Sequence, residues 1–493
     1  MTRRLKILMT ATEAHPFITA GGLGEAVGAL ARALTDRGHR VDLLLPYAPA
    51  AWARGGPELV EAAAFDIPVG ARLVPARLMT PRADGPLRPV LLNIPQYFDR
   101  PGLYGPSANE SWADNCSRFT ALSRAALLAG HALKQKYDVI HAHDWPVGPV
   151  PYLARETRAA GGHVARATVF TVHNLAYQGR FWALDLAILG LGSEHFTAER
   201  LEFFGSVSFL KAGLVAADRV TTVSVSYARE VLSPEGGMGL EGILRARGTA
   251  FSGILGGIDP TRYDPASDAA LTHRYSSAAS PERRMAAQAF RALAQLPDNE
   301  MPLFAFVGAL SNDRGGDTLL MAIDEMVAAG GLVAMLVPDH DALYGRAQAH
   351  ALRYPERVAL LAQGPGDALV RQLLSGSDFL MVPSRVEPCH VVQVAALRYG
   401  AVPLVRRTGG LRDTVLDLEA GGPAATGIGW VGDGVVPLMG AVRRAVELWK
   451  DRARYQTVQL AGAATPFTAA EGAERYEALY LDAVGHGAAP TTP

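Results

Sequence analysis

The sequence has almost no cysteine and almost no net charge, and both absences restrict the classes of protein to which it can belong. Cys116 and Cys389 are the two cysteines, and they stand too far apart to suggest a disulfide framework or a metal motif. We therefore expect a reduced, cytoplasmic setting. The formal net charge of −1 lacks the basic excess typical of nucleic-acid binding, so no nucleic-acid partner is expected.

Long hydrophobic runs are also missing. No stretch approaches the length of a membrane span, so no membrane partner is expected. The apolar start after Lys6 meets Glu13 too soon for a signal peptide. With 493 residues, 49% of them hydrophobic, the chain has enough material for two or three soluble cores.

Short apolar runs alternate with helix-length segments along the whole chain, as is typical of buried parallel strands separated by helices. In the first half we predict strands at 5–9, 41–45, 139–142, 169–172 and 220–223. In the second half we predict strands at 303–307, 332–337, 358–361, 379–382 and 402–405. Apolar spacings of three and four residues predict helices at 22–34 and around 438–449.

Turn residues concentrate in GILGGIDPTRYDP, which begins at Gly253, and this segment predicts a domain boundary. The fold class is α/β, with two doubly wound domains expected at 1–253 and 254–469. The segment 470–493 is expected to supply a helix that crosses back onto the first domain, followed by a tail.

The most informative stretch, from 381 to 415, reads MVPSRVEPCHVVQVAALRYGAVPLVRRTGGLRDTV. Glu387 follows one apolar run, and Thr408-Gly409-Gly410 follows the next. A carboxylate and glycine-rich turns at the ends of parallel strands suit a sugar-nucleotide site. Gly21-Gly22 precedes a helix whose first amides can hold a phosphate.

Each of these features also has a plainer interpretation. The glycine pair at 21–22 can be an ordinary tight turn, and Asp144, which follows the strand at 139–142, can be the N-cap of the next helix. A lone histidine such as His173 is more often structural. Arg385 and Arg407 flank the glycine-rich turn and are as readily structural ion pairs as phosphate ligands.

Many separated motifs occur in an order that resembles the bacterial glycogen synthases and plant starch synthases, from about Lys6 to Leu481. They are GGLG from 21, DRPGLY from 99, HAHDW from 141, FTVHNLAYQG from 170, FLKAGL from 209 and GLEG from 239. Serine, arginine, glutamate, proline and cysteine at 384–389 and RRTGGL from 406 complete the set. Any one motif is weak, but the ordered set is specific.

The resemblance implies a GT-B fold, in which two Rossmann-like domains face a cleft: an acceptor-side catalytic domain, 1–253, and a nucleotide-sugar-binding domain, 254–469. It implies a hexosyltransferase that moves glucose, with retention, from ADP-glucose to the non-reducing end of an α-1,4-glucan. No metal and no cofactor besides the donor substrate are expected. The implied catalytic residues are His173, Asp144, Glu387 and Arg314. The implied donor ligands are Gly21, Gly22, Cys389, His390, Thr408, Gly409 and Gly410, and the implied acceptor ligands are Tyr104 and Tyr177.

The chain departs from the family pattern near the expected donor phosphates. Thr19 and Ala309 stand where the family has lysine and arginine, and Arg314 replaces a lysine. Gly256 and His390 replace an asparagine and a glycine. Two alternatives therefore stay open: a catalytically impaired homologue that binds glucan or a partner, and a GT-B glycosyltransferase with a different donor. The acidic loop at 339–341 superficially resembles a metal-binding Asp-x-Asp pattern but is interpreted as an ordinary loop.

Overall fold

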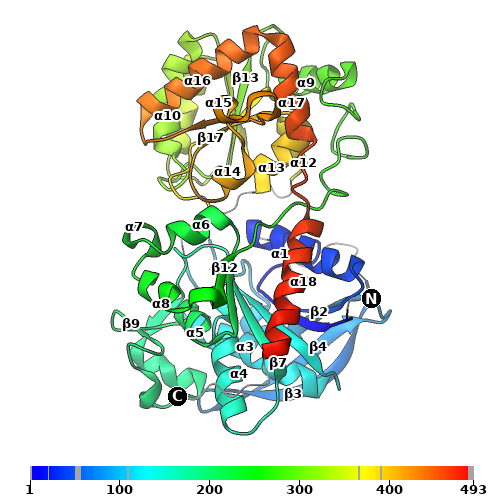
Figure 1. Cartoon of the computed structure of the whole chain (residues 1–493), viewed down its shortest axis with the longest axis vertical. Helices are drawn as coiled ribbons and strands as arrows, with labels where there is room; N and C mark the ends of the chain where they lie inside the picture. The colour runs from blue at the N-terminus through cyan, green and yellow to red at the C-terminus, as the bar shows by residue number, and fades with distance from the viewer. Residues whose placement is uncertain are drawn as a thin grey trace. The chain divides into compact units, whose positions relative to one another are not determined.

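The computed structural model describes residues 3–19, 21–49, 57–107, 110–364, 367–388 and 391–486. It divides the chain into two units (Figure 1). Unit 1 comprises the chain up to Gly257 together with the segment from Ala469, and unit 2 comprises Ile258–Thr468. The divisions lie beside the boundaries at 253 and 469 predicted from the sequence.

Within the described residues, unit 1 is built on a nine-stranded sheet in the order β12-β11-β7-β6-β1-β2-β5-β4-β3. Neighbouring strands from β12 to β5 are parallel, whereas β4 and β3 continue the sheet as antiparallel strands. The strands are β1 (Lys6–Thr10), β2 (Arg40–Pro46), β3 (Leu59–Val69), β4 (Arg72–Pro81), β5 (Leu87–Asn93), β6 (Tyr137–His143), β7 (Ala165–Val172), β11 (Arg219–Thr222) and β12 (Phe251–Gly253).

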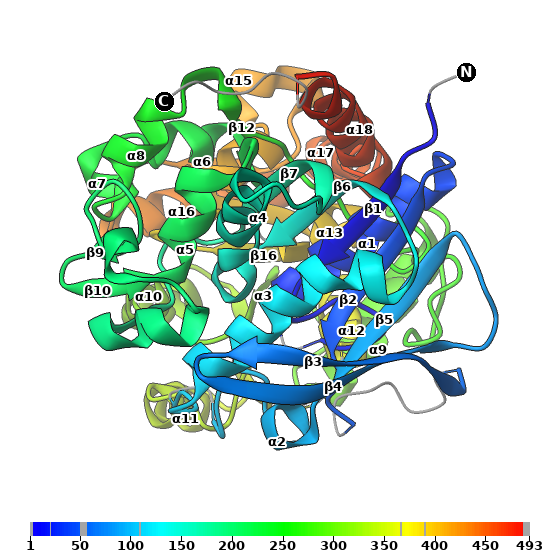
Figure 2. The same ribbon diagram turned by 90° about the horizontal axis from the view of Figure 1, so that it is seen from below.

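The chain leaves β1 toward β2 on one side and later returns to β6 on the other. The strand order therefore reverses between β1 and β6, and ligands of doubly wound sheets bind beyond the carboxyl ends of strands at such a switch point. A separate small sheet has the order β8-β10-β9, from β8 (Arg180–Trp182), β9 (Glu202–Phe203) and β10 (Ser206–Ser208). Figure 2 shows the long β3–β4 hairpin at one edge of the unit.

The helices of unit 1 include one from the far end of the chain. Helix α18 (Ala469–His486) lies along α1 (Gly22–Asp36) (Figure 1). Its Tyr476 and Tyr480 are buried in the same core as β1 and β2. The other helices are α2 (Pro95–Phe98), α3 (Asn115–Ala132), α4 (Pro149–Ala159), α5 (Phe209–Ala216), α6 (Val225–Glu230), α7 (Pro234–Gly237) and α8 (Glu241–Ala246).

Unit 2 contains a parallel sheet in the order β15-β14-β13-β16-β17-β18. Its strands are β13 (Leu303–Val307), β14 (Leu332–Val337), β15 (Val358–Ala362), β16 (Phe379–Val382), β17 (Val402–Arg406) and β18 (Ile428–Trp430). The order along the chain is 3-2-1-4-5-6, the arrangement of dinucleotide-binding folds, with its switch point between β13 and β16. Phe304 and Phe379 stack across these two strands, with ring centroids 5.1 Å apart.

Helices separate the strands of unit 2, as a parallel sheet requires. They are α9 (Pro281–Leu293), α10 (Gly316–Ala328), α11 (Tyr344–Arg353), α12 (Ala368–Gly376), α13 (Val391–Tyr399), α14 (Gly409–Thr414), α15 (Leu418–Gly421), α16 (Val435–Lys450) and α17 (Arg452–Ala463). No helix of the described segments is long and apolar enough to cross a membrane.

Every strand predicted from an apolar run is present, with ends shifted by a few residues, and the predicted α/β doubly wound class is confirmed. The predictions missed β3, β4 and β5, together with the two- and three-residue strands β8, β9, β10, β12 and β18. Strand β3 alternates between exposed and buried positions, because a strand at the antiparallel edge shows one face to water. Such a strand has no continuous apolar run to reveal it.

A buried carboxylate on α18 anchors this helix to unit 1. Glu477 Oε2 accepts a hydrogen bond at 2.7 Å from Nε of Arg37, the residue that follows α1. We expect Glu477→Ala to lower the free energy of unfolding by about 1.5–3 kcal/mol, the usual worth of a hydrogen bond to a charged group. Urea unfolding measures the loss. Glu474→Ala, an exposed glutamate on the same helix, should stay within about 0.5 kcal/mol of the native protein, and equal losses in both variants would contradict the anchoring role.

Candidate functional site

Asp144 directly follows β6 at the switch point of unit 1 and has an unusual backbone, with φ of +64°. Its Oδ1 accepts the main-chain N–H of His173, 2.9 Å away, so it joins the ends of β6 and β7. The side chain does not cap the turn that follows, at Trp145–Val147, so the N-cap interpretation does not describe its contacts. Burial raises the pKa of Asp144 to about 7, although the amides of His173 and Asn174 oppose the rise.

His173 follows β7, and both its main chain and its ring are held. The ring Nε2 lies 3.0 Å from Nδ1 of His143, the last residue of β6. Burial lowers the pKa of His173 to about 3, so the ring is neutral at physiological pH. Two residues predicted for the site from separate motifs, Asp144 and His173, are therefore brought into direct contact.

Glu13 is a buried residue of this region that the sequence interpretation missed. It follows β1, and its Oε2 accepts the main-chain N–H of Gly21 at 2.7 Å. The amide predicted to approach a phosphate thus already has a carboxylate partner. A Cβ atom at Gly21 or Gly22 would meet no atom within 4 Å, so packing does not require glycine at either position. The available signal was the position of Glu13, which follows a buried strand as Asp144 and Glu387 do.

The two predicted acceptor residues differ in their surroundings. The hydroxyl of Tyr104 donates to Glu13 Oε1 at 2.8 Å and lies 2.7 Å from Thr12 Oγ1, and burial raises the tyrosine pKa well above its ordinary value. The Tyr104 hydroxyl is therefore already paired within the described chain. The side chain of Tyr177 is 63% exposed and accessible to a large ligand.

In unit 2, Glu387 and the glycine turn at 408–410 lie against each other beyond β16 and β17. The buried Glu387 side chain accepts from Ser384 Oγ at 2.9 Å, and its main-chain oxygen accepts from Gly410 N at 2.9 Å. A Cβ atom at Gly409 would stand 1.9 Å from the Glu387 oxygen, and Gly409 has φ of +45°, so only glycine permits this close approach. Thr408 precedes the first turn of α14.

The three arginines near this turn have different surroundings. Arg314 lies beside Gly308 and, with Ser384, lines a small cavity between β13 and β16. Arg385 donates hydrogen bonds to the carboxylates of Asp317 at 2.7 Å and Asp433 at 2.8 Å. These contacts raise the pKa of Arg385 and place it in structural ion pairs. The side chain of Arg407 is exposed and makes no hydrogen bond within the described chain.

The substituted positions near β13 are also visible. Ala309 is half-buried in the turn after β13, and the next amide, of Leu310, donates to Asp341 Oδ2 at 2.8 Å. Asp341 thus stabilises the turn, and the described residues contain no cluster of three or more side chains that could hold a metal ion. Cys389 and His390, both predicted to bind the donor, lie outside the described residues.

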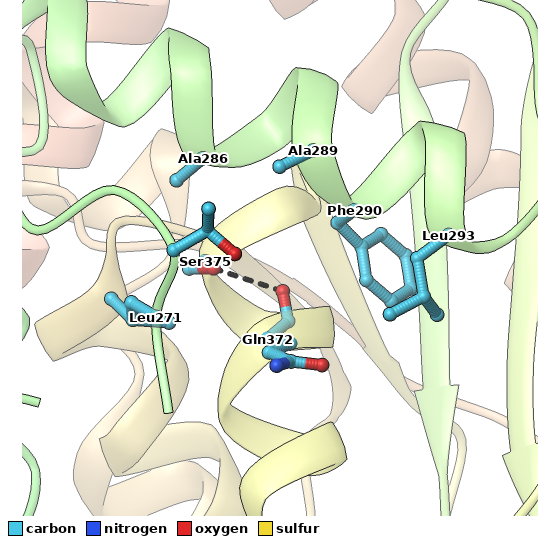
Figure 3. Close-up of a pocket in the computed structure, with 8 residues that line it drawn as sticks. Leu271, Ala286, Ala289, Phe290, Leu293, Gln372 and Ser375 are labelled. Carbon is cyan, nitrogen blue, oxygen red and sulfur yellow. Dashed lines mark hydrogen bonds between the residues drawn. The ribbon is translucent and has the colours of Figure 1, made fainter. Parts of the chain in front are cut away.

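A shallow pocket of about 40 Å³ elsewhere in unit 2 is lined by none of these residues (Figure 3). Figure 3 shows the Ser375 hydroxyl donating to the main-chain oxygen of Gln372 within α12, 2.9 Å away. The pocket lies between α9 and α12, and its lining is Leu271, Thr272, Ala286, Ala289, Phe290, Leu293, Gln372 and Ser375.

Comparison with known proteins gives a consistent set of relatives. The family described as "starch synthase catalytic domain" matches residues 6–246. "Glycogen synthase 2" of Bradyrhizobium diazoefficiens is 39% identical, with 96% of this chain and 97% of the relative covered. "Glycogen synthase" of an Anaeromyxobacter species is 37% identical, with 97% and 99% covered.

Solved structures agree with these sequences. The catalytic domain of starch synthase IV from Arabidopsis thaliana, bound to ADP and acarbose, has a TM-score of 0.90 at 27% identity, with 98% of this chain and 100% of that chain covered. Sucrose-phosphate synthase from Thermosynechococcus elongatus has a TM-score of 0.61 at 18% identity, covering 97% and 99%, and supports the fold alone.

The raised pKa of Asp144 predicts a pH-dependent stability. Its folded-state pKa of about 7 lies above the ordinary 3.8, so the folded chain retains a proton that the unfolded chain releases. This contribution to stability is fully present below about pH 4 and is lost as pH rises through about 7. Relative to the native protein, Asp144→Asn should therefore gain stability with rising pH, by at most about 1.4 kcal/mol per pH unit.

Urea unfolding between pH 4.5 and 7.5 measures this difference. Asp36→Asn, at an exposed aspartate that ends α1, is the control for a general effect of removing a carboxylate. A stability difference between Asp144→Asn and the native protein that stays constant over this range would contradict the burial of an ionisable Asp144.

Proposed function

The chain belongs to the glycogen and starch synthase family of glucosyltransferases, and we propose that it transfers glucose from ADP-glucose to the non-reducing end of an α-1,4-glucan. The observation that carries the proposal is the similarity to glycogen synthases over 96% of this chain. The GT-B fold predicted from the resemblance is confirmed by the structural relatives.

Transfer from a sugar nucleotide passes through a transition state in which the sugar carries positive charge and the leaving diphosphate gains negative charge. Asp144 and Glu387 supply carboxylates, and His173 supplies a neutral ring for the sugar hydroxyls. Arg314 is suited to the diphosphate, and the Thr408–Gly410 turn brings its main chain against Glu387. Tyr104 and Tyr177 are suited to stack against an acceptor glucan.

No metal is needed in this scheme, because cationic side chains meet the phosphate charge. This dependence on cations gives the second candidate function its basis. Ala309 and Thr19 carry no charge where the family has arginine and lysine, and two lost contacts would weaken transition-state binding by about 3–6 kcal/mol in total. A catalytically impaired homologue that binds glucan is therefore the second candidate.

A transfer assay distinguishes the two candidates. The purified chain is incubated with ADP-glucose and a maltooligosaccharide, and released ADP and lengthened glucan are measured. We expect measurable transfer, slower than that of a relative with all its phosphate cations. Glu387→Gln should lower turnover about 100-fold or more, because it removes a charge at the sugar. Glu356→Gln, at an exposed glutamate of the same unit, is the matched control.

Absence of transfer in the native chain, with glucan binding retained, would favour the impaired homologue. Native-like turnover in Glu387→Gln would remove Glu387 from the proposed machinery. A panel of other sugar nucleotides tests the remaining alternative of a different donor.

Restoring the missing cations should strengthen nucleotide binding. Ala309→Arg and Thr19→Lys should each add about 1.5–3 kcal/mol to ADP binding if each charge reaches a phosphate. Calorimetry on the single and double variants measures the gain, which should shrink with added salt. Ala349→Arg adds the same charge on the exposed face of α11 and should leave affinity unchanged. Unchanged ADP affinity in a folded double variant would mean that these positions no longer contact the donor.

A further inference from the structure

Three histidine rings lie in a row at the switch point of unit 1. His141 and His143 stand two residues apart on β6, so they share one face of the strand, and their ring centroids are 3.9 Å apart. The rings of His143 and His173 follow at 5.3 Å. The proposed function uses His173 and leaves the other two without a role.

The first ring of the row is held from both sides. His141 Nδ1 lies 2.6 Å from the hydroxyl of Tyr480 on α18, and its Nε2 lies 2.6 Å from Thr171 Oγ1 on β7. His141 is therefore a rigid surface against which the ring of His143 packs. The helix that returns from the end of the chain thus supports the row through one hydrogen bond.

The contact between His143 and His173 requires that one of the two facing nitrogens carries a proton and that the other does not. Both rings are neutral, because burial lowers the pKa of His143 well below its ordinary value and that of His173 to about 3. His143 Nδ1 and His173 Nε2 are 3.0 Å apart, so one of them donates and the other accepts.

The surroundings of the opposite nitrogen of His143 decide the direction. Its Nε2 is buried and has no hydrogen-bond partner in the described chain. If His173 donated, His143 would carry its own proton on Nε2 and bury an N–H group without an acceptor. If His143 donates from Nδ1, the buried Nε2 has only an unused lone pair. Orphaned buried N–H groups are rarer and less tolerated than under-used acceptors.

We infer that His143 is a positioning residue that donates from Nδ1 to His173 Nε2 and so holds His173 as the tautomer with a proton on Nδ1. This nitrogen of His173 makes no hydrogen bond within the described chain. Because the Asp144 carboxylate holds its amide and His143 holds its ring, His173 presents a fixed, neutral N–H donor.

The identity of the group that receives this hydrogen bond rests on the proposed function. A sugar hydroxyl oxygen suits a neutral donor, since a protonated imidazolium would repel the positive charge that develops on the sugar. The fixed tautomer then allows binding without a reorganisation of the ring. The tautomer itself follows from the contacts alone and does not depend on the substrate.

Nuclear magnetic resonance of the full chain tests the inference directly. With histidine labelled by ¹⁵N, long-range proton–nitrogen correlations distinguish protonated from unprotonated ring nitrogens, and His173→Gln identifies the signals of His173. We expect a protonated Nδ1 and an unprotonated Nε2 for His173 at pH 7. A protonated Nε2 would overturn the inference. The measurement requires no activity, so it stands whether or not glucose transfer is found.

Variants of His143 test the positioning role where transfer is measurable. His143→Leu removes the donor and should lower kcat about 10-fold or more while KM for the donor changes less than about twofold, since the hydrogen bond from the oriented ring acts chiefly in the transition state. His143→Asn retains an amide N–H near the position of Nδ1 and should recover most of the lost turnover. His131→Leu, at an exposed histidine of α3, is the matched control.

The outcomes separate this inference from the proposed function. Full activity together with a protonated Nε2 on His173 would refute the inference and leave the function intact. A protonated Nδ1 in a chain without transferase activity would support the inference and refute the function. Equal turnover in folded His143→Leu and native protein would refute the positioning role, and the native spectrum decides the tautomer even if the leucine variant does not fold.

Discussion

The hydrogen bond from the main chain of His173 to the carboxylate of Asp144 is the contact on which the rest of the unit 1 site depends. It joins the ends of two neighbouring parallel strands, β6 and β7, at the point where the strand order reverses. Asp144 adopts a backbone with positive φ to make it, a conformation that costs a non-glycine residue about 1–3 kcal/mol. The surrounding sheet holds this strain, because its strands are fixed on both sides.

The two units share the same design, since each places polar residues beyond the carboxyl ends of strands beside its switch point. In unit 1 these residues follow β1, β6 and β7, and in unit 2 they follow β13, β16 and β17. Strands β13 and β16 are wholly apolar and buried, so their polar side chains begin where each strand ends, whereas β6 already carries His141 and His143 within the strand. A rigid sheet therefore determines where these side chains stand.

This design explains which parts of the fold and site could be predicted from the sequence. Continuous apolar runs revealed most of the parallel strands but not β5, β12 or β18, and a carboxylate or glycine pair after a run indicated Asp144, Glu387 and the turn at 408–410. The edge strands β3 and β4 alternate in polarity and gave no such signal. The contacts of Glu13 and His143 reach residues 91 and 30 positions away, so only the folded chain reveals them.

The same contacts limit how this chain can hold a diphosphate. The amide of Gly21 is taken by Glu13, that of Leu310 by Asp341, and that of Gly410 by the main chain of Glu387. An amide N–H that already donates a hydrogen bond within a turn binds an anion only weakly. The positive charge of Arg385 is likewise already paired with two carboxylates. Under the proposed function, phosphate charge would then be met mainly by side chains such as Arg314 and the exposed Arg407. If positions 19 and 309 contact the donor as proposed, their lack of charge matters more here than it would where main-chain amides were free.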